Sequence, residues 1–280
     1  MRGDKLSLVL PAHNEADNIE TVVNRALEVL PQVAPSVEII VVNDGSRDST
    51  GEIIDRLAAA DPRVVAVHHP VNQGYGAALT SGFRTATGSA VMFMDSDQQF
   101  DIADITYLWP YVPFYDIVAG YRIQRRDPLY RKVYGKAFGL VVWTLFGVHL
   151  KDTDCAFKII SADLLSDMPL TTPGALINTE MLARSMRRGA TIVQVGVNHY
   201  ARQAGESSGG SPRVVLRAMG ETVRLWFRLR REKNPAGPLH AESDTADRAY
   251  GGSGRPVAGL FAVLTVVLAG IALVASRRRR

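Results

Sequence analysis

The sequence has few residues that could form disulfides or bind a structural metal ion. Its 280 residues include one cysteine, Cys155, which excludes a disulfide framework and a zinc site built from several cysteines. A single thiol favours a reducing compartment. Four histidines lack the spacing of metal ligands and are expected to be structural: His68, His69, His149 and His199.

Strong compositional bias and two common nucleotide motifs are also absent. Charged residues make up 21% and hydrophobic residues 46%, a globular balance that excludes wholesale disorder, collagen and a coiled coil. No Gly-x-x-x-x-Gly-Lys-Ser/Thr motif occurs, which excludes a P-loop. Gly74 and Gly76 lack the third glycine of a dinucleotide fingerprint and follow the third expected strand, which disfavours nicotinamide binding.

The positive charge is confined to the C-terminal quarter. Residues 1–211 hold 19 Lys/Arg and 23 Asp/Glu, whereas residues 212–233 hold seven basic and two acidic residues, and Arg277–Arg280 add four positive charges. A core with a net negative charge argues against nucleic acid as a partner. The basic segment favours contact with a membrane surface.

One segment has the character of a transmembrane helix. Residues 257–275 are uncharged and, as a helix, extend about 28 Å, close to the thickness of a bilayer's hydrocarbon core. The apolar stretch Leu6–Leu10 is too short for a signal peptide, so we expect a single-pass protein of the cell membrane with its catalytic domain in the cytoplasm. In that orientation the 276–280 tail opposes the positive-inside rule, and nothing in the sequence explains it.

The segments before this helix differ from the N-terminal domain, residues 1–211. Residues 212–233 have the pattern of a basic amphipathic helix, and residues 234–256 read as a flexible linker rich in Gly, Ser and Pro. The basic helix either lies on anionic lipid or packs on the domain with a solvated basic face.

Residues 1–200 alternate between strand and helix patterns. Helical patterns follow several apolar runs, and Ser49 with Glu52 fits a capping box. This alternation predicts an α/β fold with a Rossmann-like, mostly parallel sheet and helices on both faces. The expected strands are Leu6–Leu10, Val37–Val42, Val64–His68, Ala90–Met94 and Asp116–Gly120, and the expected helices are Asp17–Leu30, Ser49–Ala60 and Gly76–Ala86.

Polar residues follow the first four expected strands. Ligands of such sheets bind beyond the carboxyl ends of the strands, so these residues form the candidate site. Asp95 and Asp97 are two residues apart on an extended chain and therefore face the same side. Two carboxylates suit Mg²⁺ or Mn²⁺, with a diphosphate and water completing the coordination.

These blocks resemble a known family. PAHNE, VVNDGSRDST, NQGYGAALTSGF and DSDQQ look like the family-2 glycosyltransferases of GT-A fold, and most of all like polyprenyl-phosphate (dolichyl-phosphate) mannosyl- and glucosyltransferases. The resemblance covers roughly residues 5–210. It departs from the family's pattern at Ala156, where Gly is usual, and at Gly135, where Ser is common.

The resemblance implies roles for particular residues. Asp95, Asp97 and Gln99 match the family's metal and diphosphate block, with Asp97 catalytic. The resemblance also places an acidic position at Glu180. Basic residues expected to hold the phosphates are Arg122, Arg131 and Arg202, and those expected to line the nucleotide-sugar are Pro11, Ala12, His13, Glu15, Asp44 and Gly74.

The implied reaction is inverting, metal-dependent transfer of one hexose to a polyprenyl phosphate. GDP-mannose and UDP-glucose are both candidate donors, with a slight preference for GDP-mannose. The acceptor phosphate is largely dianionic at neutral pH, so no strong general base is needed. A homo-oligomer is left open.

Three alternatives remain. A sugar-hydroxyl acceptor in cell-envelope glycan synthesis would need a base, with Asp152 or Asp154 as candidates. A non-catalytic, membrane-tethered nucleotide-sugar-binding subunit is opposed by the intact Asp95, Asp97 and Gln99. A nucleotidyltransferase is weakened because the Gly-rich first loop of that class is missing after Leu10. Apart from these three, a polysaccharide polymerase is weakened because its Gln-x-x-Arg-Trp signature is missing.

Overall fold

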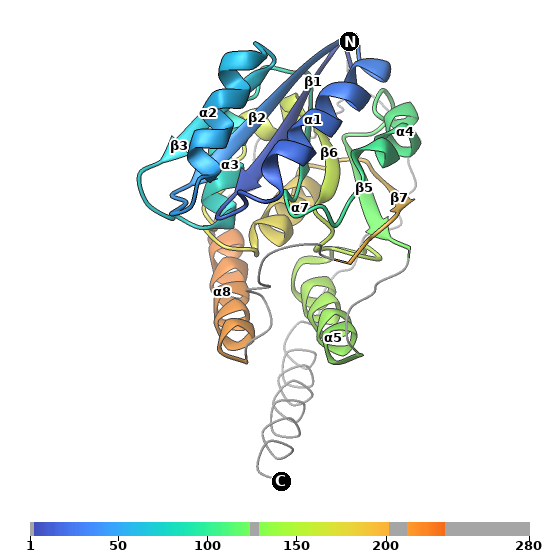
Figure 1. Cartoon of the computed structure of the whole chain (residues 1–280). Coiled ribbons are helices and arrows are strands. Elements are labelled where there is room, and N and C mark those ends of the chain that lie inside the picture. Colours follow the sequence, from blue (N-terminus) through green and yellow to red (C-terminus); the bar gives the residue numbers. More distant parts are fainter. Residues whose placement is uncertain (1–2, 124–128, 202–211, 233–280) are drawn as a thin grey trace.

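A mixed β-sheet with helices around it forms the body of the chain (Figure 1). The computed structural model describes residues 3–123, 129–201 and 212–232. The strands of this part lie in the order β3-β2-β1-β4-β6-β5-β7. Their bounds are β1 Lys5–Ala12, β2 Ser36–Asp44, β3 Val64–His69, β4 Ala90–Met94, β5 Ile117–Arg122, β6 Phe157–Ser161 and β7 Ile192–Val197.

All of these strands except β6 run in one direction. β1 pairs in parallel with β2 and β4, β2 with β3, and β5 with β7, whereas β6 is antiparallel to both β4 and β5. The carboxyl ends of six strands therefore meet at one edge, which we call the carboxyl edge. β6 starts at this edge, so the loop before Phe157 lies there too.

The connections place a topological switch point between β1 and β4. From β1 the chain moves outward through β2 to β3 and then returns to β4 on the other side of β1. Right-handed crossovers therefore put α1 and α2 on one face and α3 on the other. Close packing of Gly82 in α3 against Val9 and Val42 agrees with this arrangement. In α/β sheets a switch point is where ligands bind.

The helices surround the sheet on both faces. Their bounds are α1 Ile19–Val29, α2 Thr50–Ala60, α3 Tyr75–Thr85, α4 Ile105–Leu108, α5 Leu129–Phe146, α6 Ala162–Ser166, α7 Ile177–Arg187 and α8 Pro212–Arg231, with short 3₁₀ turns η1 Leu30–Gln32, η2 Ile102–Asp104 and η3 Trp109–Tyr111.

The predicted α/β class and mostly parallel sheet are confirmed, and each predicted apolar run lies within a strand or overlaps one. β1 and β2 are buried on both faces, which is why they read as continuous apolar runs. The capping box predicted at Ser49 is wrong, because the Ser49 side chain makes no cap hydrogen bond. A carboxylate oxygen of Asp48 instead accepts a hydrogen bond from the N–H of Thr50, the first residue of α2, at 3.0 Å.

A helix forms where the basic amphipathic segment is predicted. α8 buries Thr222, Leu225 and Leu229 and leaves Phe227 51% exposed. One of its faces therefore packs on the domain. Figure 1 shows α5 and α8 extending away from the carboxyl edge of the sheet.

The predicted membrane anchor cannot be compared with the structure. The linker 234–256, the transmembrane segment 257–275 and the tail 276–280 lie outside the described residues, so they stay predictions. Within the residues that the structure describes, no helix is both long enough and apolar enough to cross a bilayer.

Glu38 stabilises the opposite edge of the sheet. Its carboxylate accepts from the Ser7 hydroxyl at 2.5 Å and the Thr87 N–H at 2.7 Å, and it pairs with Lys5 at 2.9 Å. Burial pushes the pKa of Glu38 up, but these partners together lower the pKa below its usual value. A lowered folded-state pKa means that the ionised form stabilises the fold.

We expect Glu38→Gln to lower the free energy of unfolding by about 2 kcal/mol at pH 7. The contribution is complete above the unfolded-state pKa of about 4.3 and is lost as pH falls through the folded-state value. Urea unfolding at pH 7 and pH 3 should therefore show a difference from wild type that shrinks in acid. Glu28→Gln, at an exposed side chain, is the control. An equal loss at both pH values would contradict this assignment.

Candidate active site

A cavity of about 570 Å³ opens at the carboxyl edge beside the switch point. Its walls come from the loops that follow β1, β2, β3 and β4, as the sequence predicts. The lining includes eight of the predicted site residues: Pro11, Ala12, His13, Glu15, Asp44, Gly74, Asp95 and Asp97. Asn14, Asn72, Tyr75, Ala78 and Ser96 complete it.

Hydrogen bonds between the loops hold these walls in place. The Ser96 hydroxyl donates to the Pro11 carbonyl at 2.9 Å, which ties the loop after β4 to the end of β1. Asn14 adopts a positive φ of 55°, and its side-chain oxygen accepts from the Arg47 N–H at 2.9 Å. The loops after β1 and β2 are therefore joined to each other by hydrogen bonds.

Asp44 anchors residues 72–76, which we call the donor loop. Its carboxylate accepts from the Gln73 N–H at 2.9 Å, the Gly74 N–H at 2.8 Å and His69 Nδ1 at 2.7 Å. Ser81 contacts the other nitrogen of His69 at 2.8 Å. The structure thus shows Asp44 as the organiser of the donor loop, and its predicted contact with the base stays a prediction.

Asp95 and Asp97 fit a divalent cation. Asp97 is 8% exposed at the cavity wall, and Asp95 Oδ1 is buried without a hydrogen-bond partner in the described part of the chain. Burial, followed by the charge of Asp97, raises the pKa of Asp95 to about 7, against the opposing influence of Tyr75, Arg122 and Lys158. A buried carboxylate oxygen without a partner is what a cation would satisfy. The described residues contain no group of three or more His, Cys, Asp or Glu side chains that could hold a metal ion, so the two aspartates would need further ligands from the substrate or water.

Two other predicted residues whose side chains are described, Gln99 and Arg122, are not part of the cavity lining. The Gln99 side-chain amide donates to the Tyr200 carbonyl at 3.3 Å, away from the cavity lining. Arg122 forms a two-pronged ion pair with Asp152, at 2.6 and 2.8 Å. Arg131 lies on α5 where only the backbone is described, and Arg202 lies outside the described residues. The roles predicted for these residues stay predictions.

The comparison with protein families decides the classification. Residues 7–170 match the model described as Glycosyl transferase family 2. The chain belongs to glycosyltransferase family 2. The resemblance predicted from the sequence blocks is thereby confirmed at the level of the family.

Curated relatives of this family-2 glycosyltransferase are longer proteins. The chain is 31% identical to glycosyltransferase AglD from Haloferax volcanii over 81% of its own length and 38% of the relative's. It is 30% identical to an undecaprenyl-phosphate 4-deoxy-4-formamido-L-arabinose transferase from Pectobacterium carotovorum over 72% of its own length and 62% of the relative's. The chain therefore spans less than two thirds of either relative.

A solved structure shares the fold of this family-2 glycosyltransferase. Glucosyl-3-phosphoglycerate synthase from Mycobacterium tuberculosis, in a complex with Mn²⁺, UDP-glucose and phosphoglyceric acid, aligns with a TM-score of 0.63 at 21% identity, over 80% of each chain. At this identity the likeness extends to the fold alone.

Two further residues of this glycosyltransferase, Tyr75 and Lys158, affect the charge state of Asp95, although the sequence predicts no site role for them. Tyr75 lines the cavity, and burial with the charges of Asp95 and Asp97 raises its pKa well above the usual value. Lys158 is fully buried, donates to the carbonyls of Thr153 and Cys155, and has its pKa lowered by burial. Lys158 ends the segment 152–158, which resembles an acidic–Cys-Gly-Phe-Lys/Arg block of the family, but the sequence predicts no role for it.

Proposed function

We propose that this chain transfers one hexose, with inversion, from a nucleoside-diphosphate sugar to a polyprenyl phosphate at the cytoplasmic face of a membrane. The observation that carries the proposal is the cavity at the switch point, whose lining combines Asp95 and Asp97 with residues at the carboxyl ends of β1, β2 and β3. A relative that is named as an undecaprenyl-phosphate transferase supports the lipid acceptor.

The residues of the cavity suit this chemistry. A Mg²⁺ or Mn²⁺ ion held by Asp95 and Asp97 would neutralise charge on the departing nucleoside diphosphate. The loops after β1 and β3 enclose the nucleotide, and the fixed loop geometry orients the sugar toward its acceptor. Because Arg122 engages the Asp152 carboxylate, Asp152 is poorly placed to act as the base that a sugar-hydroxyl acceptor needs.

Donor and acceptor can be identified in one assay. Membranes containing the full chain are incubated with labelled GDP-mannose or UDP-glucose and a polyprenyl phosphate, and the label is followed into the organic phase. We expect label from one donor to enter that phase, with GDP-mannose slightly preferred, and to remain in water after chelation of divalent metal. Transfer to free glycans without labelled lipid would favour the hydroxyl-acceptor alternative.

The carboxyl edge also has the surface expected beside lipid. Six of the nine exposed large apolar side chains among the described residues lie there or on α5 and α8, namely Val71, Ile123, Leu140, Trp143, Tyr200 and Phe227. Exposed arginines of α8 add the positive charge that anionic lipid attracts. We therefore place this edge at the membrane surface, where the acceptor phosphate lies.

We expect Trp143→Ser combined with Phe227→Ser to slow transfer to a long-chain acceptor in vesicles about fivefold, because two apolar anchors are lost. Transfer to a short, water-soluble polyprenyl phosphate should be unchanged. Phe114→Ser, at a residue 74% exposed beyond η3, provides the matched control. Equal loss with both acceptors would contradict a role in lipid contact.

A further inference from the structure

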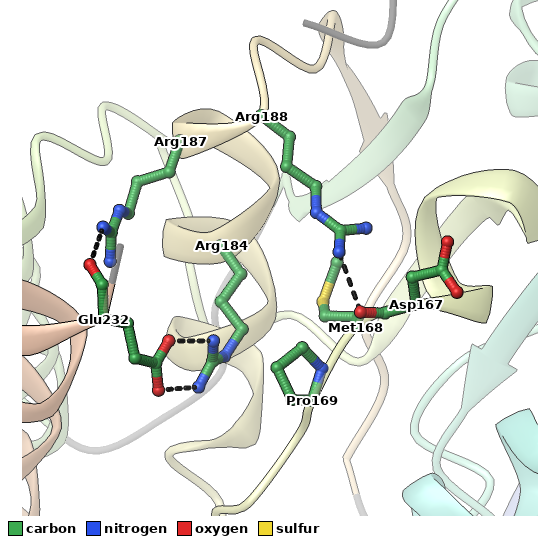
Figure 2. Close-up of a pocket in the computed structure, with 7 residues that line it drawn as sticks. All are labelled: Asp167, Met168, Pro169, Arg184, Arg187, Arg188 and Glu232. Carbon is green, nitrogen blue, oxygen red and sulfur yellow. Dashed lines mark hydrogen bonds and ion pairs between the residues drawn. The ribbon is translucent and has the colours of Figure 1, made fainter. Parts of the chain in front are cut away.

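A second cavity, of about 380 Å³, lies between α7, α8 and the segment after α6 (Figure 2). Three arginines from the end of α7 line it. Arg184 pairs with the Glu232 carboxylate at 2.6 and 3.0 Å, and Arg187 donates to the Leu229 and Glu232 carbonyls. Figure 2 shows Arg188 turned the other way, and it donates to the Asp167 carbonyl at 2.8 Å. Two of the arginines therefore fasten the end of α8, and the third does not.

Arg184 also connects Glu232 to a buried residue of α7. Its guanidinium also pairs at 3.0 Å with Glu180, which is completely buried. Glu180 in turn accepts from the Thr171 N–H at 3.1 Å, the Thr171 hydroxyl at 2.9 Å and the Thr172 N–H at 2.8 Å. Arg228 of α8 donates to the same Thr171 hydroxyl. α8 is thus bonded to residues 171–174 by two routes, and we call these residues the support segment.

The support segment packs directly on the donor loop. The Pro173 carbonyl accepts from the Gly76 N–H at 2.7 Å. A Cβ on Gly74 would lie 2.6 Å from the Pro173 oxygen, and one on Gly76 would lie 2.1 Å from the Thr172 oxygen. No side chain separates the two backbones, so a displacement of the support segment must displace the donor loop as well.

We propose that α8 sets the position of the donor loop through Glu232, Arg184, Glu180 and the support segment. This inference rests on the proposed function, since it assigns the donor loop to nucleotide binding. Glu180, Arg184 and Glu232 are positioning residues that touch no substrate. With α8 at the lipid surface, the position of α8 on the domain is thereby coupled to the affinity for the nucleotide. Because such coupling is reciprocal, nucleotide binding favours the same position of α8.

The test compares Arg184→Gln and Glu232→Gln with Arg188→Gln, which removes a charge from the same cavity but no contact to α8. Hydrogen exchange is measured at the amides of Gly76 and Ala77 in the full chain. Binding of GDP and of UDP with Mg²⁺ is measured by calorimetry. We expect exchange about tenfold faster and nucleotide Kd about tenfold higher in Arg184→Gln. Glu232→Gln should show a smaller change of the same kind, and Arg188→Gln should match wild type.

Transfer kinetics add a readout that separates positioning from chemistry. KM for the donor should rise while kcat at saturating donor stays near the wild-type value, because the reacting groups are untouched.

Unchanged exchange at Gly76 and Ala77 in both variants would overturn the coupling, whatever the sugar. Faster exchange that spreads equally to the amides of β1 would also overturn it, because the effect would then be global. Failure of the wild-type chain to bind either nucleotide would refute the proposed function, while the exchange measurement would still decide the coupling.

Discussion

Asp97→Asn is expected to reduce sugar transfer about 10³-fold while leaving the chain folded. The Asp97 side chain forms part of the cavity wall, and its Oδ1 accepts from the Gln99 N–H at 3.1 Å. An asparagine oxygen can keep that hydrogen bond. What disappears is the negative charge that, with Asp95, would hold a divalent cation against the diphosphate.

Asp101→Asn is the matched control for this variant. Asp101 lies four residues further along the chain, outside the lining of the cavity, and its carboxylate accepts from the Ala103 N–H at 2.9 Å. Label entering the organic phase and the thermal unfolding temperature are measured for both variants. We expect Asp101→Asn to transfer at close to the wild-type rate. Near-normal transfer by Asp97→Asn, or by wild type after chelation, would remove the basis of the proposed mechanism.

The sequence predicts those site residues that directly follow an apolar strand. Each of the first four strands is an apolar run followed by polar residues, buried in β1, β2 and β4 and largely half-buried in β3, and a parallel sheet brings such ends to one edge. That is why His13, Asp44, Gly74 and Asp97, from four separate loops, share one cavity.

What the sequence could not provide is the partner of each side chain. The family resemblance predicts that Arg122 binds phosphate, and the structure shows its guanidinium paired with Asp152, 30 residues further along. Gln99 belongs to the Asp-x-Asp-x-Gln block, but its amide reaches Tyr200, 101 residues away. Such pairings depend on the antiparallel β6 and on β7, whose places in the sheet follow from long-range packing. A motif therefore locates a residue at the edge without fixing its contacts.

Gly76→Ala is expected to lower the free energy of unfolding by about 3 kcal/mol and to weaken nucleotide binding about 30-fold. The added methyl group would lie 2.1 Å from the Thr172 oxygen and 2.8 Å from the Gly174 oxygen. Both obstacles are backbone atoms, so no side chain can rotate away. The support segment and the donor loop must separate, which costs the hydrogen bond from the Gly76 N–H to the Pro173 carbonyl.

Gly139→Ala makes the same chemical change without the obstruction. A Cβ on Gly139, in the middle of α5, would meet no atom of the described residues within 4 Å, and alanine in a helix interior stabilises by about 0.5–1 kcal/mol relative to glycine. Thermal unfolding should therefore show a loss of stability in Gly76→Ala and a small gain in Gly139→Ala, while calorimetry should show weaker binding of GDP or UDP in Gly76→Ala alone. If Gly76→Ala kept wild-type stability and affinity, the two backbones would not be in close contact. The support segment could then not position the donor loop.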